Sequence, residues 1–175
     1  MANTFTKIAA VMVGSGGASS IDFTSIPSTY TDLQILISAR SDASSGSNAA
    51  DISIRLNNDS GTNYSYRGLT GTGSTSGSFS LSGETQFTYI AFAGSSNVTS
   101  NTFGNSSVYF PNYAGATNKS LSADVVTENN ATLTYMRLNA GLWANTAAIN
   151  RMTLTIVSAN FVQYSTATLY GIKNS

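Results

Sequence analysis

Hydrophobic and polar residues alternate with a period of two along most of the chain, and no stretch has the spacing of an amphipathic helix. The clearest runs are DLQILISAR at 32–40 and DISIRLN at 51–57, in which every second residue is apolar. Alternation of this kind is typical of antiparallel strands that bury one face and expose the other. The inward positions that we expect in these two runs are Leu33, Ile35, Ile37, Ala39, Ile52, Ile54 and Leu56.

The same alternation predicts strands in SLSADVV at 120–126, INRMTLTIV at 149–157 and TATLYGIK at 166–173. In LTYMRLNAGLW at 133–143, it places Arg137 on one face and Met136 and Leu138 on the other. The run FTKIAAVMV at 5–13 has the positive charge and apolar core of a signal peptide. We predict a strand there instead, because the apolar run is only about seven residues long.

Loops rich in Gly, Ser, Thr and Asn separate these runs, at 41–50, 71–83 and 93–107. We expect 71–83 to be a surface loop within the domain, because strands flank it on both sides. Roughly ten strands divided by turn residues predict an all-β fold, a two-sheet antiparallel β-sandwich that is jelly-roll-like. The length fits a single domain over residues 1–175.

The composition excludes several kinds of chemistry. The chain has no Cys and no His, so disulfides, thiolate nucleophiles and a Ser–His–Asp mechanism are impossible. Eight acidic and eight basic residues cancel, so no net charge attracts nucleic acid or anionic lipid, and no apolar stretch reaches membrane-spanning length. Ser and Thr together make up 50 of 175 residues, so hydrogen-bonding groups replace the usual charges. Such a surface suits an extracellular or virion-exposed protein.

The stretch RLNNDSGTNYSYRGL at 55–69 concentrates small polar residues and allows three interpretations. Asn57, Asn58, Asp59 and Ser60 offer oxygen ligands to calcium, but one carboxylate without a following bidentate Glu makes a poor calcium loop. Asn58 begins one of six N-glycosylation sequons, a number that chance alone gives in a chain so rich in Asn, Ser and Thr. We therefore predict the bend of a β-hairpin here, and no metal or cofactor.

Two other kinds of site fail on spacing. The acidic residues form no pair that the strand pattern would bring together for glycoside hydrolysis. GSGG at 14–17 and GTGSTSG at 71–77 lack the Lys-Ser/Thr and the following helix of a phosphate loop. We expect no catalytic residue and no enzymatic activity.

Aromatic residues are better candidates for a function, because tyrosine in a polar segment gives a large contact area at low entropic cost. The candidates for an interface or a recognition surface are Tyr64, Tyr66, Arg67, Phe79, Tyr109, Phe110 and Tyr113. The alternative is that these rings plug the ends of the sandwich or form subunit contacts. Arginines in or beside the strands either anchor a partner or cap the sheet edges. They are Arg40, Arg55, Arg67, Arg137 and Arg151.

Four segments resemble small virion proteins of tailed bacteriophages, particularly those of marine and cyanobacterial hosts. They are YTDLQILISARS, IRLNNDSGTNYSYRGLTG, LWANTAAINRMTLT and NFVQYSTATLYGIK. The resemblance runs from about Phe23 to Lys173, is most recognisable in NNDSG-x-NYSYR-x-L and LYGIK, and leaves out Gly71 to Asn105. It implies a location in the virion more firmly than a role. It also implies a trimeric β-sandwich of the kind used by decoration proteins and fibre tips, and carries over no catalytic residue.

We therefore expect a virion structural protein, made in the host cytoplasm and located on the phage particle, with no nucleic acid or membrane as partner. The first hypothesis is a capsid decoration or cement protein that forms a homotrimer on the head surface and stabilises the shell through contacts with the major capsid protein or other virion proteins. The second is a tail- or fibre-associated receptor-binding module that contacts host surface glycans. The first expected strand begins at about Phe5 and leaves no separate attachment segment, which favours the first hypothesis. A secreted carbohydrate-binding module is a third, weakened by the single Trp.

Overall fold

The computed structural model describes residues 4–44, 48–130 and 133–173, which form β-strands joined by turns and loops. No helix occurs in these ranges, so the all-β prediction is confirmed. The strands are β1 (Thr4–Met12), β2 (Ser20–Phe23), β3 (Asp32–Ala39), β4 (Ala49–Leu56), β5 (Tyr64–Gly71), β6 (Ser76–Glu84), β7 (Phe87–Gly94), β8 (Gly104–Phe110), β9 (Lys119–Val126), β10 (Met136–Trp143), β11 (Met152–Ile156) and β12 (Thr166–Lys173).

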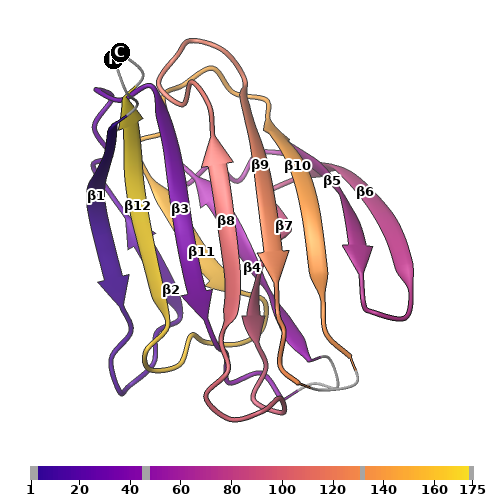
Figure 1. Ribbon diagram of the computed structural model, residues 1–175. Helices are drawn as coiled ribbons and strands as arrows, with labels where there is room; N and C mark the ends of the chain where they lie inside the picture. The colour runs from indigo at the N-terminus through magenta and orange to yellow at the C-terminus, as the bar shows by residue number, and fades with distance from the viewer. Residues whose placement is uncertain (1–3, 45–47, 131–132, 174–175) are drawn as a thin grey trace.

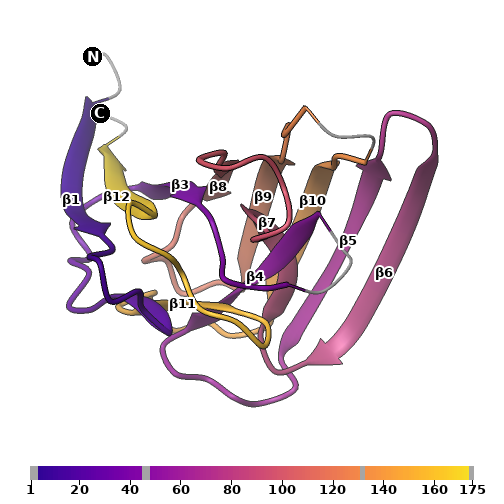
Figure 2. The same ribbon diagram turned by 90° about the horizontal axis from the view of Figure 1, so that it is seen from below.

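The strands form two antiparallel sheets that pack as a sandwich. The large sheet has eight strands in the order β1-β12-β3-β8-β9-β10-β5-β6, and the small sheet has four in the order β2-β11-β4-β7. Figure 1 shows the large sheet in front, with β1 at one edge and β6 at the other, and the small sheet behind it. Figure 2 shows that β5 and β6 extend to one side, beyond β4 of the small sheet.

The topology is a jelly roll with two insertions. Without β5, β6, β9 and β10, eight strands remain in two four-stranded sheets, β1-β12-β3-β8 and β2-β11-β4-β7. Numbered along the chain, these sheets have the orders 1-8-3-6 and 2-7-4-5, which is the jelly-roll arrangement. The inserted strands extend the large sheet on the β8 side, in the order β9-β10-β5-β6, and widen it beyond the small one.

The core lies between the two sheets and consists of the residues that the alternation predicted. Ile35 and Ile37 of β3 and Ile52 and Ile54 of β4 are fully buried, as is the inward face of β12. These side chains belong to one continuous apolar cluster that includes both sheets. The period-two pattern therefore identified the buried face because β3, β4 and β12 face the opposite sheet along their length.

The segment 71–83 was expected to be a surface loop, and that expectation is wrong for most of it. Residues Ser76–Glu84 form β6, which pairs with β5 and ends the large sheet. Phe79 and Leu81 are half-buried and pack against the core, whereas Ser78, Ser80 and Ser82 are exposed. The alternation of SFSLS was hidden by glycine and serine, whose low strand propensity is here overridden by pairing with β5.

Apart from Trp143, strand β10 directs its large apolar residues outward and its polar residues inward. Asn139 and Trp143 are buried between the sheets, whereas Met136 and Leu138 are 60% and 62% exposed. Inward Gly141 leaves room for Phe87, whose ring would lie 2.8 Å from an added Cβ. Hydrophobicity alone would have chosen the opposite face of this strand.

Candidate functional site

The polar stretch 57–63 connects the two sheets, so the predicted hairpin is wrong. It links β4 of the small sheet to β5 of the large sheet, and these strands do not pair with each other. Asn57 and Asn58 have positive φ values of 50° and 56°, a conformation that asparagine tolerates. The side chain of Asn57 donates to the carbonyl of Ala148 at 2.8 Å and accepts from the amide of Asn150 at 2.9 Å. The chain does turn at this stretch, as its residues predict, but long-range packing determines with which strands β4 and β5 pair.

Asp59 holds this crossover together. Its carboxylate accepts hydrogen bonds from Trp143 Nε1 at 2.8 Å, Asn63 Nδ2 at 2.9 Å and the Gly61 amide at 2.8 Å. Burial raises the pKa of Asp59, but these donors outweigh burial and hold the pKa below its ordinary value. The carboxylate is therefore occupied by the protein itself. Across the described ranges, no group of three or more Asp or Glu side chains is placed to hold a metal ion.

Four of the seven aromatic and arginine candidates lie in the core. They are Tyr64, Tyr66, Phe110 and Tyr113, each at most 2% exposed. A side chain with so little accessible surface offers nothing to a partner, which matches the alternative that these rings fill the sandwich. Phe79, which the composition placed in the loop 71–83, lies in β6, and Tyr109 and Phe110 lie in β8. The candidates that retain accessible surface are Arg67, Phe79 and Tyr109.

Most of the arginines brace the fold. Arg40 donates to the carbonyls of Thr99 at 2.9 Å and Thr102 at 3.0 Å and so fixes the loop before β8. Arg151 forms an ion pair of 2.6 Å with Asp22, across β11 and β2. Arg67 differs from these, because it is exposed on β5 and, among the described residues, has no hydrogen-bond or ion-pair partner.

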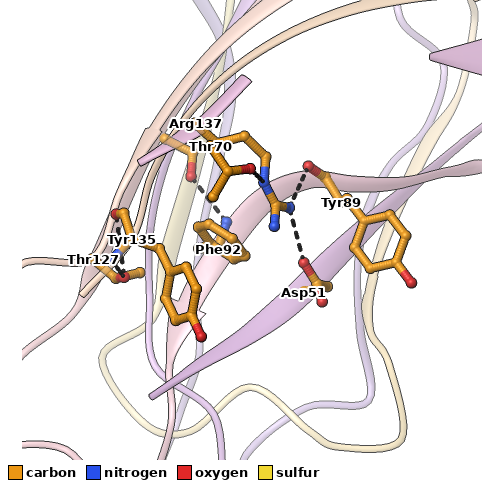
Figure 3. Close-up of polar contacts among 8 residues, drawn as sticks. Asp51, Thr70, Tyr89, Phe92, Thr127, Tyr135 and Arg137 are labelled. Atoms are coloured by element: carbon orange, nitrogen blue, oxygen red, sulfur yellow. Dashed lines mark hydrogen bonds and ion pairs between the residues drawn. The ribbon is translucent and has the colours of Figure 1, made fainter. Parts of the chain in front are cut away.

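Arg137 lies where the inserted strands cross the small sheet, and Figure 3 shows its guanidinium between three oxygen acceptors. It forms an ion pair of 3.2 Å with Asp51 of β4. It also donates to the Tyr89 carbonyl at 3.1 Å and to Thr70 Oγ1 at 3.1 Å. One side chain of β10 therefore ties together β4, β5 and β7.

Aromatic rings surround the same guanidinium. Its central carbon lies 4.2 Å from the ring centroid of Phe92, 5.1 Å from that of Phe79 and 5.5 Å from that of Tyr89. Cation–π attraction is strongest when water is excluded, and the Arg137 side chain is only 11% exposed. Burial raises the pKa of Asp51, and the Arg137 charge offsets only part of that rise. We read this cluster as a structural brace.

Lys119 is a second buried cation and is also structural. Its Nζ donates to the backbone carbonyls of Gly115 at 2.7 Å, Thr117 and Thr146 at 3.3 Å, and burial lowers its pKa. These bonds join the turn after β8 to the segment after β10. Each of these three acceptors is a backbone carbonyl, so the amine is committed to holding these two turns together.

The outer face of the inserted strands is the remaining feature with a functional implication. Leu69 of β5 is 63% exposed beside Leu138 of β10, which is its cross-strand partner. Both residues line two adjoining grooves of about 620 and 420 Å³ that cross this face. Arg67 and Asp124 lie at the margins of the apolar area. An exposed apolar sheet face of this kind is typical of a surface that another protein covers.

The sequence of β10 contains a pattern that indicates an apolar side on this strand. The run MRLNAGLW alternates large apolar residues with Arg137, Asn139 and Gly141. One face of the strand is therefore apolar, whether that face points into the core or outward. The long-range contacts of Arg137 and the packing of Trp143 decided that the apolar side points outward.

The chain matches no protein-family model, no curated protein and no solved structure. Within the described ranges, no helix has the length and apolar character to cross a membrane.

Proposed function

We propose that this chain is a non-enzymatic structural protein of the phage virion, a decoration or cement protein that assembles as a homotrimer on the head surface and stabilises the shell. The observation that carries the proposal is the outer face of the large sheet, where Leu69, Met136 and Leu138 are each at least 60% exposed. Removing such apolar surface from water is the main driving force for association. The sequence resemblance between residues 23 and 173 supports the location in the virion.

The mechanism is adhesive. The outer face is rigid because Arg137 braces β10 against β4 and β7 from the inner side. A rigid surface loses little entropy on binding, so more of the apolar contact energy appears as affinity. A protein that binds the assembled shell and not its separate subunits stabilises that shell by mass action.

A second candidate function is a receptor-binding module of the tail or fibre, with host glycans as ligands. Tyr89 favours it, because its ring is 36% exposed and packs against Phe79 with a centroid distance of 5.9 Å. Tyr89 also has a positive φ of 68°, a strained conformation that is often found at functional sites. The amphipathic tyrosine ring is well suited to contact a sugar.

The copy number of the protein in purified virions tests the choice between these two functions. Quantitative mass spectrometry against the major capsid protein is expected to give a number in fixed proportion to the capsid lattice. A number at the level of the tail proteins contradicts the decoration role and favours receptor binding. Absence from the virion contradicts both.

A further inference from the structure

Apolar side chains are exposed at two places on the outer face of the large sheet. On β1, Phe5 is 57% and Met12 is 69% exposed. On β10, Met136 and Leu138 are exposed to a similar degree. The strands between them carry mainly polar residues on this face, including Gln34, Ser107 and Ser122, with Leu36 and Val126 as less exposed apolar exceptions. The face therefore has two apolar strips, which we call the β1 strip (Phe5, Ala10, Met12) and the β10 strip (Met136, Leu138, Leu142).

The register of the sheet puts matching residues of the two strips at the same height along the strands. The row of paired residues that starts at Met12 ends at Met136, after passing through Thr166, Ser38, Asn105 and Val126. The row that starts at Lys7 ends at Ala140, after passing through Tyr170, Gln34, Tyr109 and Ser122.

Phe5 and Leu142 complete the match. Phe5 lies two residues before Lys7 on β1, and Leu142 lies two residues after Ala140 on β10, in the same direction along the sheet. Each exposed apolar end of the β1 strip thus has a partner of similar size at its own height in the β10 strip.

We propose that the β1 strip of one chain packs on the β10 strip of a second copy of this chain, and that this contact, repeated three times, closes the homotrimer. Rotation about an axis that runs along the strands leaves every residue at its own height. Met12 of one copy then meets Met136 of the next, and Phe5 meets Leu142. The inference rests on the proposed function and names the contact surface of its self-assembly.

Charge complementarity supports this pairing. Lys7 and Asp124 are both exposed and, within the part of the chain that the structure describes, neither has a hydrogen-bond or ion-pair partner. Lys7 lies at the same height as Ala140 of β10. Asp124 pairs with Leu138, which lies two residues from Ala140, about 7 Å along the strand. In the proposed contact, the long Lys7 side chain reaches Asp124 of the neighbouring copy. An ion pair at that point fixes the orientation of the two sheets.

One such contact is too small to hold a stable open pair. The contact involves three strands on each partner, β1-β12-β3 on one and β8-β9-β10 on the other. Its area is about 14 Å wide and about 27 Å long. This area is about half of the 800 Å² that one partner buries in a standard interface. In a closed trimer every chain makes two of these contacts, so an open pair is weak and the ring is stable.

Light scattering coupled to size-exclusion chromatography tests the contact. The wild-type protein is expected at three times the chain mass of 18.2 kDa. Leu138→Glu and Met12→Glu are each expected to give monomers, because each places a charge in one of the strips. An equimolar mixture of the two variants retains a single intact combination of strips, so it is expected to form no trimer and at most a weak one-to-one pair. The matched control Val157→Glu changes a residue that is 49% exposed outside the large sheet and is expected to leave the trimer intact.

Two further variants keep the test independent of folding. The chain has no cysteine, so Met12→Cys combined with Met136→Cys in one chain is expected to form disulfide-linked dimers and trimers under mild oxidation. The two positions are five strands apart in one copy, about 24 Å, which is too far for an intramolecular disulfide. The pair Val157→Cys with Met136→Cys is the control and is expected to remain unlinked.

Several results would overturn the inference. They are a monomeric wild-type protein, a trimer that survives both Glu substitutions, or a dependence on Leu138 without a dependence on Met12. If the trimer survives the substitutions, the contact surface proposed here is wrong, but the decoration role is not contradicted. If the trimer depends on both strips but the protein is absent from virions, the contact surface is supported and the decoration role is contradicted.

Discussion

Replacing Arg137 by methionine removes the charge of the brace and keeps most of its apolar contact. The side chain of Arg137 joins Asp51 on the small sheet to the inserted part of the large sheet, with aromatic rings packed around it. Methionine fills similar space against Phe92 and Phe79 but donates no hydrogen bond.

The expected loss of stability is about 3 kcal/mol. Breaking a buried ion pair from one side costs about 3–5 kcal/mol, because the partner charge stays buried. Asp51 keeps 27% of its side-chain exposure, so we assign roughly 2 kcal/mol to the pair. The carbonyl of Tyr89 and the hydroxyl of Thr70 lose their donor, which adds about 1 kcal/mol.

The loss also depends on pH. In the variant, the Arg137 charge no longer offsets the effect of burial, so the pKa of Asp51 rises further above its ordinary value of 3.8. The folded state then binds a proton more tightly than the unfolded state. The stability from such a group is present below pH 3.8 and is lost as the pH rises through the folded-state pKa. The substitution is therefore expected to cost more at about pH 7 than at about pH 4.

Urea unfolding followed by tryptophan fluorescence measures both effects. Trp143 is the single tryptophan, is fully buried and lies on β10, the strand that carries Arg137. With a slope of about 2–3 kcal/mol per molar urea, the midpoint is expected to fall by about 1 M or more. Arg137→Lys retains the charge and is expected to cost less. A fall below about 0.3 M, or an equal cost at both pH values, refutes the brace.

Two further substitutions test the inserted strands. Asp59→Ala leaves Trp143 Nε1 and its other donors without a charged acceptor and is expected to destabilise the fold by about 1–3 kcal/mol, measured by urea unfolding. Because the folded-state pKa of Asp59 is lowered, its contribution is present above pH 3.8 and is lost as the pH falls through the folded-state value, so an undiminished cost in acid contradicts this account. Gly68→Ala puts a Cβ at 2.4 Å from Asn139 Oδ1 and 2.6 Å from the Phe79 ring. It is expected to cost about 1–3 kcal/mol by the same assay, and an unchanged midpoint shows that these side chains move aside freely.

The two insertions explain how a jelly roll acquires an interaction face. They place β9, β10, β5 and β6 beside β8, so the large sheet has twice the width of the small one. The inner face of this extension is covered by the Arg137 cluster and by the aromatic rings around it. Among the described residues, no second layer covers its outer face, and there the apolar residues remain exposed.

Prediction of the site from sequence failed mainly over the aromatic residues. Tyr64, Tyr66 and Tyr113 lie next to polar residues in the sequence, which suggested recognition loops. Each occupies the core, and Tyr64 completes its hydrogen bonding with the backbone of Leu56. A tyrosine next to polar neighbours is buried or exposed according to the strand on which it lies, and sequence proximity does not report that.

The alternation of side chains determined the strands and the buried face of β3, β4, β9, β11 and β12, because that pattern depends only on the geometry of an extended chain beside one apolar layer. The absence of Cys and His likewise fixed which chemistry is impossible. The tertiary structure alone decided that NNDSG crosses between sheets, that SFSLS is an edge strand and that β10 turns Leu138 outward. Each of these outcomes depends on residues far away in the sequence, such as Asp51 opposite Arg137 and Asp59 opposite Trp143, whose pairing energy exceeds the local preference of the segment.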